Sequence, residues 1–272
     1  VSLNLPNVDA FKVDSNDLKI NITVEDNEKA PRYTGVTLNN IKVAPSPNWL
    51  QQSLRAIGLM PINNVVDVTN YVMHELGTPL HAFDATVVNG NVLVRKAKQG
   101  EKIVTLDGVE RELSTEDLVI ANANEAMCIA GVFGGNKSGV SEKTTSIFLE
   151  AAYFNPISVR KTAKRHGLNT DASFRFERGV DPHRVIYAMK RAALLIKKLA
   201  GGEISMEPVD VYPMTIEKVA IAFRFDKCRA VIGKSIDNAS ILTILRNLDF
   251  EVQNETPAAC KLLAPTYRTD VT

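Results

Sequence analysis

The first candidate for chemistry in this sequence is a glutamate inside an apolar run. Glu150 lies within IFLEAAYF, between Leu149 and Ala151. A carboxylate at such a position either faces water from the edge of a sheet or is buried for a purpose, because burial of an unpaired charge is costly. The residues alone leave both alternatives open.

A histidine follows a glycine and a proline in the segment TPLHAFD. His81 comes after Gly77 and Pro79, and this composition predicts an irregular segment. Loops carry many binding and catalytic residues, so His81 is a candidate site residue. A structural histidine that satisfies its own hydrogen bonds is the alternative.

A third candidate is the stretch from Gly167 to His183, GLNTDASFRFERGVDPH. Thr170 offers a side-chain oxygen, and Ala172 is small enough to let another group approach closely. Phe174 and Phe176 alternate with charged residues, and this period of two predicts a short, half-buried strand. We expect the stretch to form one wall of a binding pocket.

Basic residues gather in the same part of the chain. Between Arg160 and Lys198 there are eleven lysines and arginines, against three acidic residues. Such a local excess suits contact with a phosphate backbone. Two solvated helix faces explain the same pattern, and both interpretations stay open.

The composition narrows the class of protein. The chain has 272 residues, 45% of them hydrophobic and 23% charged, with a net charge of +1, so no global field points to nucleic acid or membrane. Three scattered cysteines form no CxxC, which argues against a disulfide framework or zinc site and favours a reducing cytoplasm. There is no secretory signal or spanning segment. The first residue is not methionine, and we expect a fragment of a longer protein.

No standard catalytic motif is present. His74 is not followed by a second histidine at zincin spacing, and the glycines of GVFGG (131–135) match neither the dinucleotide fingerprint nor the P-loop. A GxSxG elbow is also missing. Turns or tight strand packing are the ordinary explanation of such glycines.

The helices and strands that the sequence predicts around these residues indicate a mixed α+β or α/β fold. The segment 65–76 reads as a helix that ends at Gly77, and Asn155-Pro156 caps a helix to about His166. Residues 92–134 read as strands, with a hairpin about Asp107-Gly108. Asp181-Pro182 starts a helix to about residue 200. A domain boundary is expected near 208–214, followed by a small winged-helix-like unit.

Six stretches together resemble the beta subunit of bacterial phenylalanyl-tRNA synthetases. They are YTGV (33–36), DVTNYVMHELGTPLHAFD (67–84), GVFGG (131–135), SIFLEAAYF (146–154), GLNTDASFRFERGVDP (167–182) and PTYRTDV (265–271). The resemblance implies a β-rich editing module at residues 30–208, the third and fourth domains of that subunit. It also implies the N-terminal part of the fifth domain at 213–272, with 1–29 as an upstream linker or strand segment.

The resemblance also implies a function. Enzymes of this family attach phenylalanine to tRNA(Phe) with ATP and magnesium, and the synthetic site is on the alpha subunit of a heterotetramer of two alpha and two beta subunits. The editing module hydrolyses tyrosine wrongly attached to tRNA(Phe). A fragment that acts only as scaffold or RNA-binding surface is the alternative, and a free-standing editing or nucleic-acid-binding protein is a third possibility.

The resemblance also implies roles for individual residues, with Glu150 taking the tyrosine hydroxyl and Ala172 bounding the pocket. A water molecule is expected to attack the ester directly, because no residue stands out as a nucleophile. Residues with an implied catalytic role are Thr69, Asn70, His81 and Glu150; those that bind substrate are Gly134, Thr170 and Ala172; Asp270 matches a magnesium ligand, with the remaining ligands expected beyond residue 272.

Overall fold

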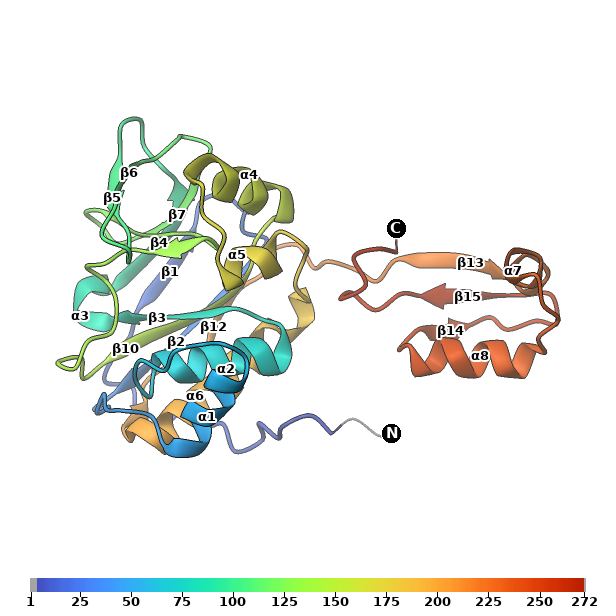
Figure 1. The fold of residues 1–272 in the computed structure, drawn as a ribbon, viewed down its shortest axis with the longest axis horizontal. Coiled ribbons are helices and arrows are strands. Elements are labelled where there is room, and N and C mark those ends of the chain that lie inside the picture. The colour runs from blue at the N-terminus through green and yellow to red at the C-terminus, as the bar shows by residue number, and fades with distance from the viewer. Residues whose placement is uncertain (1–3, 272) are drawn as a thin grey trace. The chain divides into compact units, whose positions relative to one another are not determined.

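The computed structural model describes residues 4–271, which form two compact units, one up to Met214 and one from Thr215 onward. Both units combine helices with β-sheet (Figure 1), so the predicted mixed α+β class is confirmed. Within residues 4–271, no helix combines the length and the apolar character needed to cross a membrane.

One sheet of the first unit has the strand order β1–β4–β7–β8–β9. β1 runs parallel to β4, and the other neighbours are antiparallel. β7 and β8 are buried along their whole length, as their near-continuous apolar runs predict. The strands are β1 (Asn21–Val24), β4 (Asn91–Lys96), β7 (Leu118–Ala121), β8 (Ala126–Ile129) and β9 (Phe133–Gly134).

The second sheet of this unit has the order β11–β2–β10–β3, and β12 also pairs with β2. β10 is a central strand, with β2 on one side and β3 on the other, both antiparallel to it. The strands are β2 (Arg32–Asn39), β3 (Leu80–Asp84), β10 (Ile147–Tyr153), β11 (Glu203–Ile204) and β12 (Val209–Val211).

The prediction of an irregular segment around His81 is wrong. Residues 80–84 form β3, which pairs with β10 from Ile147 opposite Asp84 to Ala151 opposite Leu80. The pairing partner lies more than sixty residues further along the chain, so the local composition of TPLHAFD does not reveal the strand.

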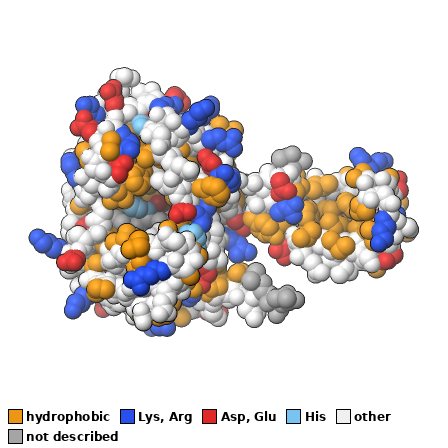
Figure 2. All heavy atoms as spheres, in the orientation of Figure 1, with side chains coloured by type: hydrophobic (Ala, Val, Ile, Leu, Met, Phe, Trp, Pro, Cys, Tyr) orange, Lys and Arg blue, Asp and Glu red, His pale blue; other side chains and the backbone are white. Residues whose placement is uncertain are grey.

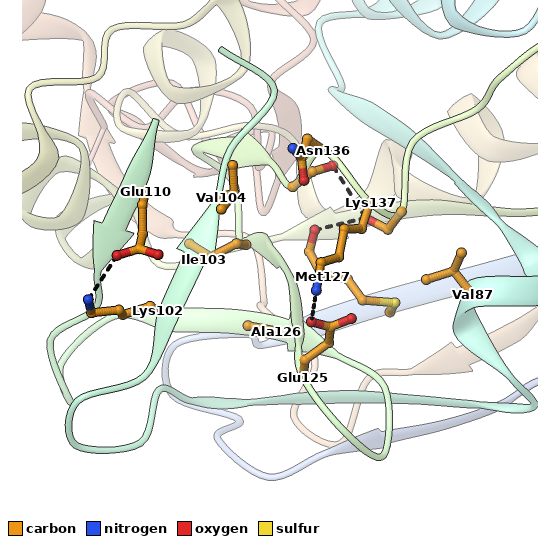
Figure 3. A pocket seen from close by; sticks show the side chains of 12 residues that line it. Val87, Lys102, Ile103, Val104, Glu110, Glu125, Ala126, Met127, Asn136 and Lys137 are labelled. Atoms are coloured by element: carbon orange, nitrogen blue, oxygen red, sulfur yellow. Dashed lines mark hydrogen bonds and ion pairs between the residues drawn. The ribbon is translucent and has the colours of Figure 1, made fainter. Parts of the chain in front are cut away.

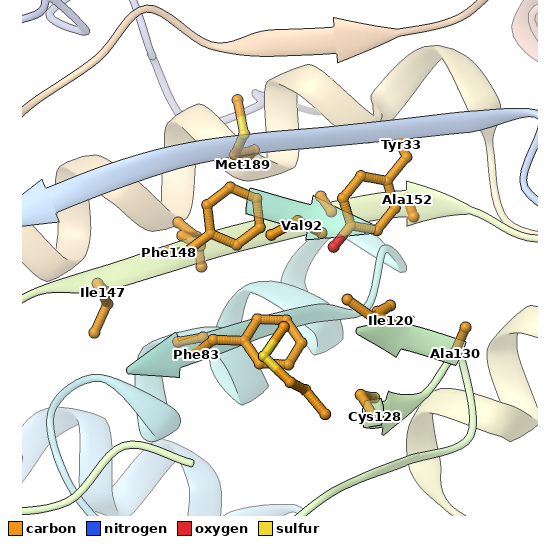
Figure 4. Close-up of a cluster of buried hydrophobic side chains, with 14 of the residues drawn as sticks. Tyr33, Phe83, Val92, Ile120, Cys128, Ala130, Ile147, Phe148, Ala152 and Met189 are labelled. Carbon is orange, nitrogen blue, oxygen red and sulfur yellow. The ribbon is translucent and has the colours of Figure 1, made fainter. Parts of the chain in front are cut away.

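The two faces of this sheet have different neighbours. Side chains alternate along a strand, so Glu150 shares a face with Phe148 and with Tyr33 of β2. This face meets the first sheet, and Figure 4 shows Tyr33, Phe83 and Phe148 gathered with Cys128 in the core between the sheets. Helices α2 and α6 cover the opposite face (Figure 1).

Helices begin and end largely where the capping residues predict. The Asn155 side chain accepts hydrogen bonds from the N–H groups of Ile157 and Ser158, and both Gly77 and Gly167 take the left-handed conformation after the last helical residue. The helices are α1 (Asn48–Ala56), α2 (Val66–Leu76), α3 (Ala85–Val88), α4 (Pro156–His166), α5 (Asp171–Phe176), a 3₁₀ turn at Pro182–Arg184 and α6 (Val185–Ala200).

The strand predicted from the alternation of Phe174 and Phe176 is also wrong, because Asp171–Phe176 is the helix α5. A reciprocal capping box starts it. The Thr170 side chain accepts from the N–H of Ser173, and the Ser173 hydroxyl accepts from the N–H of Thr170. These local hydrogen bonds outweigh the alternating pattern, which is too short to specify a strand on its own.

The hairpin predicted about Asp107-Gly108 is present. Its strands are β5 (Lys102–Val104) and β6 (Glu110–Glu112), and Gly108 has a positive φ of 78°. The described part of the segment before residue 30 packs on the same unit, since Phe11 and Leu18 contact its core and Asp14 accepts a hydrogen bond from Lys197.

The second unit follows the predicted series of strand, two helices and two strands. Its sheet has the order β13–β15–β14. Phe225, Ile241, Leu242 and Leu262 are among the side chains of its own small core. The elements are β13 (Ala220–Arg224), α7 (Phe225–Ile232), α8 (Asn238–Asn247), β14 (Glu251–Gln253) and β15 (Ala259–Leu263).

Candidate functional site

The first unit contains a cavity of about 430 Å³ that lies among α2, β3, the β8–β9 segment and the start of α5. Figure 2 shows this unit hollowed on the face in view, with histidine atoms inside the hollow and hydrophobic side chains around it. The structure brings together every residue expected to act on or bind the substrate: Thr69, Asn70, His81, Gly134, Glu150, Thr170 and Ala172.

Glu150 and His81 lie opposite each other on neighbouring strands. They are register partners of β10 and β3, so their side chains leave the same face of the sheet. Only 6% of Glu150 is exposed, and its Oε2 atom has no hydrogen-bond partner among residues 4–271. The Nε2 atom of His81 is likewise buried and without a partner there.

Burial sets the protonation of both groups. It raises the pKa of Glu150 to about 8 and lowers the pKa of His81 to about 4, because a dry environment disfavours the charged forms. At neutral pH the site therefore holds a neutral carboxylic acid beside a neutral imidazole. The acid can both donate and accept a hydrogen bond, and the imidazole can donate from one nitrogen and accept at the other.

Gly134 makes room for the histidine. A Cβ atom at this position would lie 3.0 Å from Cε1 of His81 and 3.1 Å from Cδ1 of Leu106. A side chain here would push the imidazole away from β9. Glycine thus lets the ring lie against the strand and keeps the cavity open beside it.

Helix α2 supplies the wall that carries Thr69 and Asn70. The Thr69 hydroxyl already donates to the Val66 carbonyl at 2.8 Å, so only its acceptor lone pairs are available. In the described part of the chain the Asn70 amide has no hydrogen-bond partner, although Asn70 lines the cavity. Asn70 is the residue of this wall with free donors.

Helix α5 supplies the opposite wall, and Thr170 holds it in place. Its hydroxyl accepts from the N–H of Ser173 at 3.0 Å and donates to the Val132 carbonyl at 2.8 Å. Thr170 therefore ties the start of α5 to the segment between β8 and β9. Ala172, the second residue of α5, presents only a methyl group to the cavity.

Most of the remaining lining is apolar. A mainly hydrophobic cavity with a few convergent polar groups is typical of a small-molecule site, and its volume falls within the range of about 300–1,000 Å³ for ligand pockets. The apolar lining comprises Leu59, Ile62, Val66, Met73, Pro79, Leu80, Ala82, Leu106, Val132, Phe133, Val140 and Phe176.

Sequence reasoning missed two residues near Glu150. Cys128 lines the cavity, and burial, followed by the Glu150 carboxyl, raises the pKa of its thiol well above the usual value. Tyr33 lies behind the cavity, fully buried, and its hydroxyl has no partner among residues 4–271. Alternating apolar residues could have marked Tyr33 as a core residue, but no sequence signal reveals an unpartnered hydroxyl.

The predicted magnesium ligand lies in the second unit, apart from any candidate metal site. Asp270 is 65% exposed and accepts two hydrogen bonds of 2.9 Å from Arg268, which lowers the pKa of its carboxyl to about 2. Within residues 4–271 no group of three or more His, Cys, Asp or Glu side chains could hold a metal ion. The described residues alone do not provide a magnesium site.

Much of the predicted basic excess is neutralised inside the first unit. Arg165 pairs with the buried Asp117, and Arg191 pairs with Glu75 on α2 at 2.9 Å. Similar ion pairs join Arg175 to Asp171, Arg178 to Glu177, Arg184 to Asp181 and Lys197 to Asp14. These contacts support the interpretation of the basic residues as part of ordinary helix packing and solvation.

A second, smaller cavity of about 180 Å³ lies between the β5–β6 hairpin and β8 (Figure 3). Its charged side chains face one another in pairs. Lys102 contacts Glu110 and Lys137 contacts Glu125, each at 2.8 Å. No unpartnered buried polar atom of the described residues belongs to its lining.

Comparison with known proteins gives two family matches. Residues 29–201 match the B3/4 domain, and residues 221–272 match the tRNA synthetase B5 domain.

The chain is also similar to curated proteins described as phenylalanine–tRNA ligase beta subunits. It is 52% identical to the subunit of Bacteroides fragilis over 271 residues, which is 99% of this chain and 33% of the relative. The identity is 50% over 272 residues for Porphyromonas gingivalis, again with 99% and 33% covered. For Carboxydothermus hydrogenoformans it is 45% over 262 residues, with 95% and 32% covered. The chain thus spans about a third of the length of these relatives.

Proposed function

The chain belongs to the B3/4 domain family, and from this premise we propose that it is the editing part of a phenylalanine–tRNA ligase beta subunit. In this proposal the cavity of the first unit hydrolyses the ester of tyrosine wrongly attached to tRNA(Phe). Residues 30–208 form the editing module, and residues 213–272 are the N-terminal part of the following domain.

The physical need for such a site follows from the two amino acids. Tyrosine differs from phenylalanine by one hydroxyl, and an apolar pocket rejects an added hydroxyl only by about a hundredfold. A site that requires the hydroxyl discriminates far more strongly, because phenylalanine leaves its polar groups unpaired. A second site of this kind can hydrolyse the Tyr-tRNA(Phe) that the synthetic site produces in error.

One observation carries the proposal: a mainly apolar cavity holds the buried, unpartnered Oε2 of Glu150 and the buried, unpartnered Nε2 of His81. An aromatic ring fits the apolar lining, and the phenol hydroxyl supplies the missing partner to Glu150. A phenylalanyl ring would bury the same carboxyl without a partner. Glu150 thereby selects for tyrosine.

The remaining polar residues can position the ester and the attacking water. His81 is neutral because burial lowers its pKa to about 4, so Nε2 can accept a hydrogen bond from water. The free amide of Asn70 can donate to the ester carbonyl as charge develops on its oxygen. Cys128 does not suit a nucleophile, because burial holds the pKa of its thiol high.

The rest of the enzyme enters the proposal as partners. An alpha subunit carries the synthetic site, which uses ATP and magnesium, and two copies of each subunit form a heterotetramer in the cytoplasm. tRNA(Phe) brings its charged end to the cavity. Since the described residues do not provide a magnesium site, no step of the editing reaction proposed for this chain uses the ion.

The test is deacylation of Tyr-tRNA(Phe) by the ligase with Glu150→Ala in this chain. The phenol hydroxyl then stays buried without its partner, which predicts a fall in kcat/KM of about tenfold or more, with phenylalanine attachment unchanged. Undiminished deacylation would remove Glu150 from the mechanism. If wild-type ligase edits and the isolated chain binds tRNA without editing, the chain contributes a scaffold or RNA-binding surface instead.

A further inference from the structure

Behind the cavity lies a tyrosine whose hydroxyl has no partner. Tyr33 is 0% exposed, and residues 4–271 offer its oxygen no hydrogen bond. A buried hydroxyl left unpaired costs about 1–3 kcal/mol, and buried polar groups in native proteins almost always find a partner in the protein, in water or in a ligand. Glu150 Oε2 is in the same situation. If two unpartnered buried atoms lie close together, one shared hydrogen-bond partner can satisfy both.

The strand register places these two side chains together. Gly35 lies opposite Glu150 and Tyr33 lies opposite Ala152, so Tyr33 and Glu150 are diagonal neighbours on one face of the sheet. Diagonal neighbours lie roughly 7–8 Å apart and are within reach of an aromatic side chain. The small Ala152 leaves room for the Tyr33 ring beside Glu150. In Figure 4 the Tyr33 hydroxyl points away from β2 into the space between the sheets.

The position directly opposite Glu150 on β2 is closed. A Cβ atom at Gly35 would lie only 2.1 Å from Cζ of Phe148, which shows that the Phe148 ring covers this glycine. The Phe148 ring therefore occupies the space over Gly35. Of the two polar diagonal neighbours of Glu150 on β2, Thr37 already donates its hydroxyl to the Leu18 carbonyl at 2.6 Å, and the Tyr33 hydroxyl has no partner among residues 4–271. On β3 the neighbour is His81, which already lines the cavity.

The electrostatics agree with this placement. Burial raises the pKa of Tyr33 well above its ordinary value, and the Glu150 carboxyl raises it further because a second negative charge nearby is unfavourable. Tyr33 therefore remains a neutral O–H donor throughout the working pH range. A donor that never ionises is suited to hold a carboxyl group in one orientation.

We propose that Tyr33 is a positioning residue for recognition of the substrate hydroxyl: through one bound water, its O–H orients the Glu150 carboxyl toward the phenol. This inference rests on the proposed editing function and deepens it. The two side chains supply two of the two to four hydrogen bonds that a buried water makes. Oε2 has two lone pairs, so it can meet both this water and the phenol of tyrosine, whereas phenylalanine leaves the second lone pair without a partner.

The experiment is Tyr33→Phe in the ligase, which removes one oxygen and keeps the ring. We expect kcat/KM for Tyr-tRNA(Phe) deacylation to fall about fivefold to tenfold, the value of one lost hydrogen bond. The slow deacylation of Phe-tRNA(Phe) stays the same, so the tyrosine-to-phenylalanine ratio falls by the same factor. A merely structural role would lower both rates together and leave the ratio unchanged, which would overturn the inference.

The matched control is Tyr153→Phe. Tyr153 lies three residues from Glu150 on the same strand, so its side chain leaves the opposite face, and the ratio is expected to stay at the wild-type value. Glu150→Ala separates the two proposals. If it abolishes tyrosine deacylation while Tyr33→Phe leaves the ratio unchanged, only the role of Tyr33 is overturned. If Glu150→Ala itself has no effect, the proposed editing site is overturned as well.

Discussion

The two cavities of the first unit share strand β8, and they differ in whether their buried polar groups have hydrogen-bond partners. Met127 of β8 lines the smaller cavity and Cys128 lines the larger, because successive side chains of a strand point to opposite faces. In the same way, Gly134 lines the larger cavity and Gly135 lines the smaller.

The smaller cavity is rich in charge, but each charge already has a partner. Its lysines and glutamates form ion pairs whose side chains are about half exposed to water. The larger cavity has few polar atoms, and two of them are buried without a partner in the described chain. The larger cavity is therefore the candidate binding site because of its unmet hydrogen bonds and not because of its charge.

The largest expected effect comes from filling the larger cavity. In Ala172→Trp the indole occupies the space of the tyrosyl ring, and we expect Tyr-tRNA(Phe) deacylation by the ligase to fall at least about a hundredfold, as for a misplaced substrate. Phenylalanine attachment, measured on the same preparation, should not change. Ala56→Trp places the same side chain at the exposed end of α1 and should edit normally. Full editing by Ala172→Trp would show that tyrosine binds elsewhere.

The second largest effect is a pH-dependent gain in the stability of Glu150→Gln relative to wild type. Burial raises the pKa of Glu150 from 4.5 to about 8, so this group destabilises the folded chain increasingly as pH rises from 4.5 to 8. Glu150→Gln removes that dependence. The free energy of unfolding of the variant relative to wild type should increase by about 2–3 kcal/mol between pH 5 and pH 7, at 1.36 kcal/mol per pH unit.

Urea unfolding at the two pH values measures this difference. Glu125→Gln in the smaller cavity is the matched control, since its carboxylate is exposed and paired, and no comparable increase is expected. An equal stability difference at pH 5 and pH 7 for Glu150→Gln would mean that Glu150 ionises normally and that burial does not raise its pKa.

A smaller effect tests how the α5 wall is held. Thr170→Val removes the N-cap of α5 and the hydrogen bond to Val132, and we expect a loss of about 1 kcal/mol in unfolding free energy. Deacylation should slow as the wall loosens. Thr170→Ser keeps the hydroxyl and should retain most of both properties. Normal stability with slow deacylation in Thr170→Val would instead indicate direct contact of the hydroxyl with substrate.

The smallest effect belongs to the smaller cavity. Lys137→Ala breaks the ion pair with Glu125, whose side chains are 69% and 47% exposed. Exposed pairs contribute about 0–1 kcal/mol, so we expect a change in stability within that range and no change in editing. A tenfold loss of Tyr-tRNA(Phe) deacylation would show that this cavity takes part in the reaction.

Local signals in the sequence predict much of the fold. Asn155 and Gly167 mark the ends of α4, and Asp107-Gly108 marks the hairpin, because caps and tight turns depend on residues close in sequence. The strand at His81 is not predictable in this way, since its pairing with β10 is long-range. The α5 helix is missed because an alternating pattern of four residues competes with a cap whose partner is Ser173 rather than glutamate.

The candidate site also combines residues that the sequence marks with residues that only the packing reveals. Glu150 stands out in the sequence as an acid within an apolar run, although the residues alone do not decide between burial and solvation. The resemblance to a known family assigns the other lining residues, and the structure gathers them around one cavity. Tyr33 could not be predicted, because the lack of a partner for its hydroxyl depends on the packing of two sheets.

The measurement that tests the account most directly is a crystal structure of the ligase with tyrosine bound to this chain. We expect the aromatic ring to lie between α2 and α5, with the phenol oxygen within about 3 Å of a Glu150 carboxyl oxygen. A tyrosine whose hydroxyl points out of the cavity, or one bound in the smaller cavity beside Lys137, would contradict it.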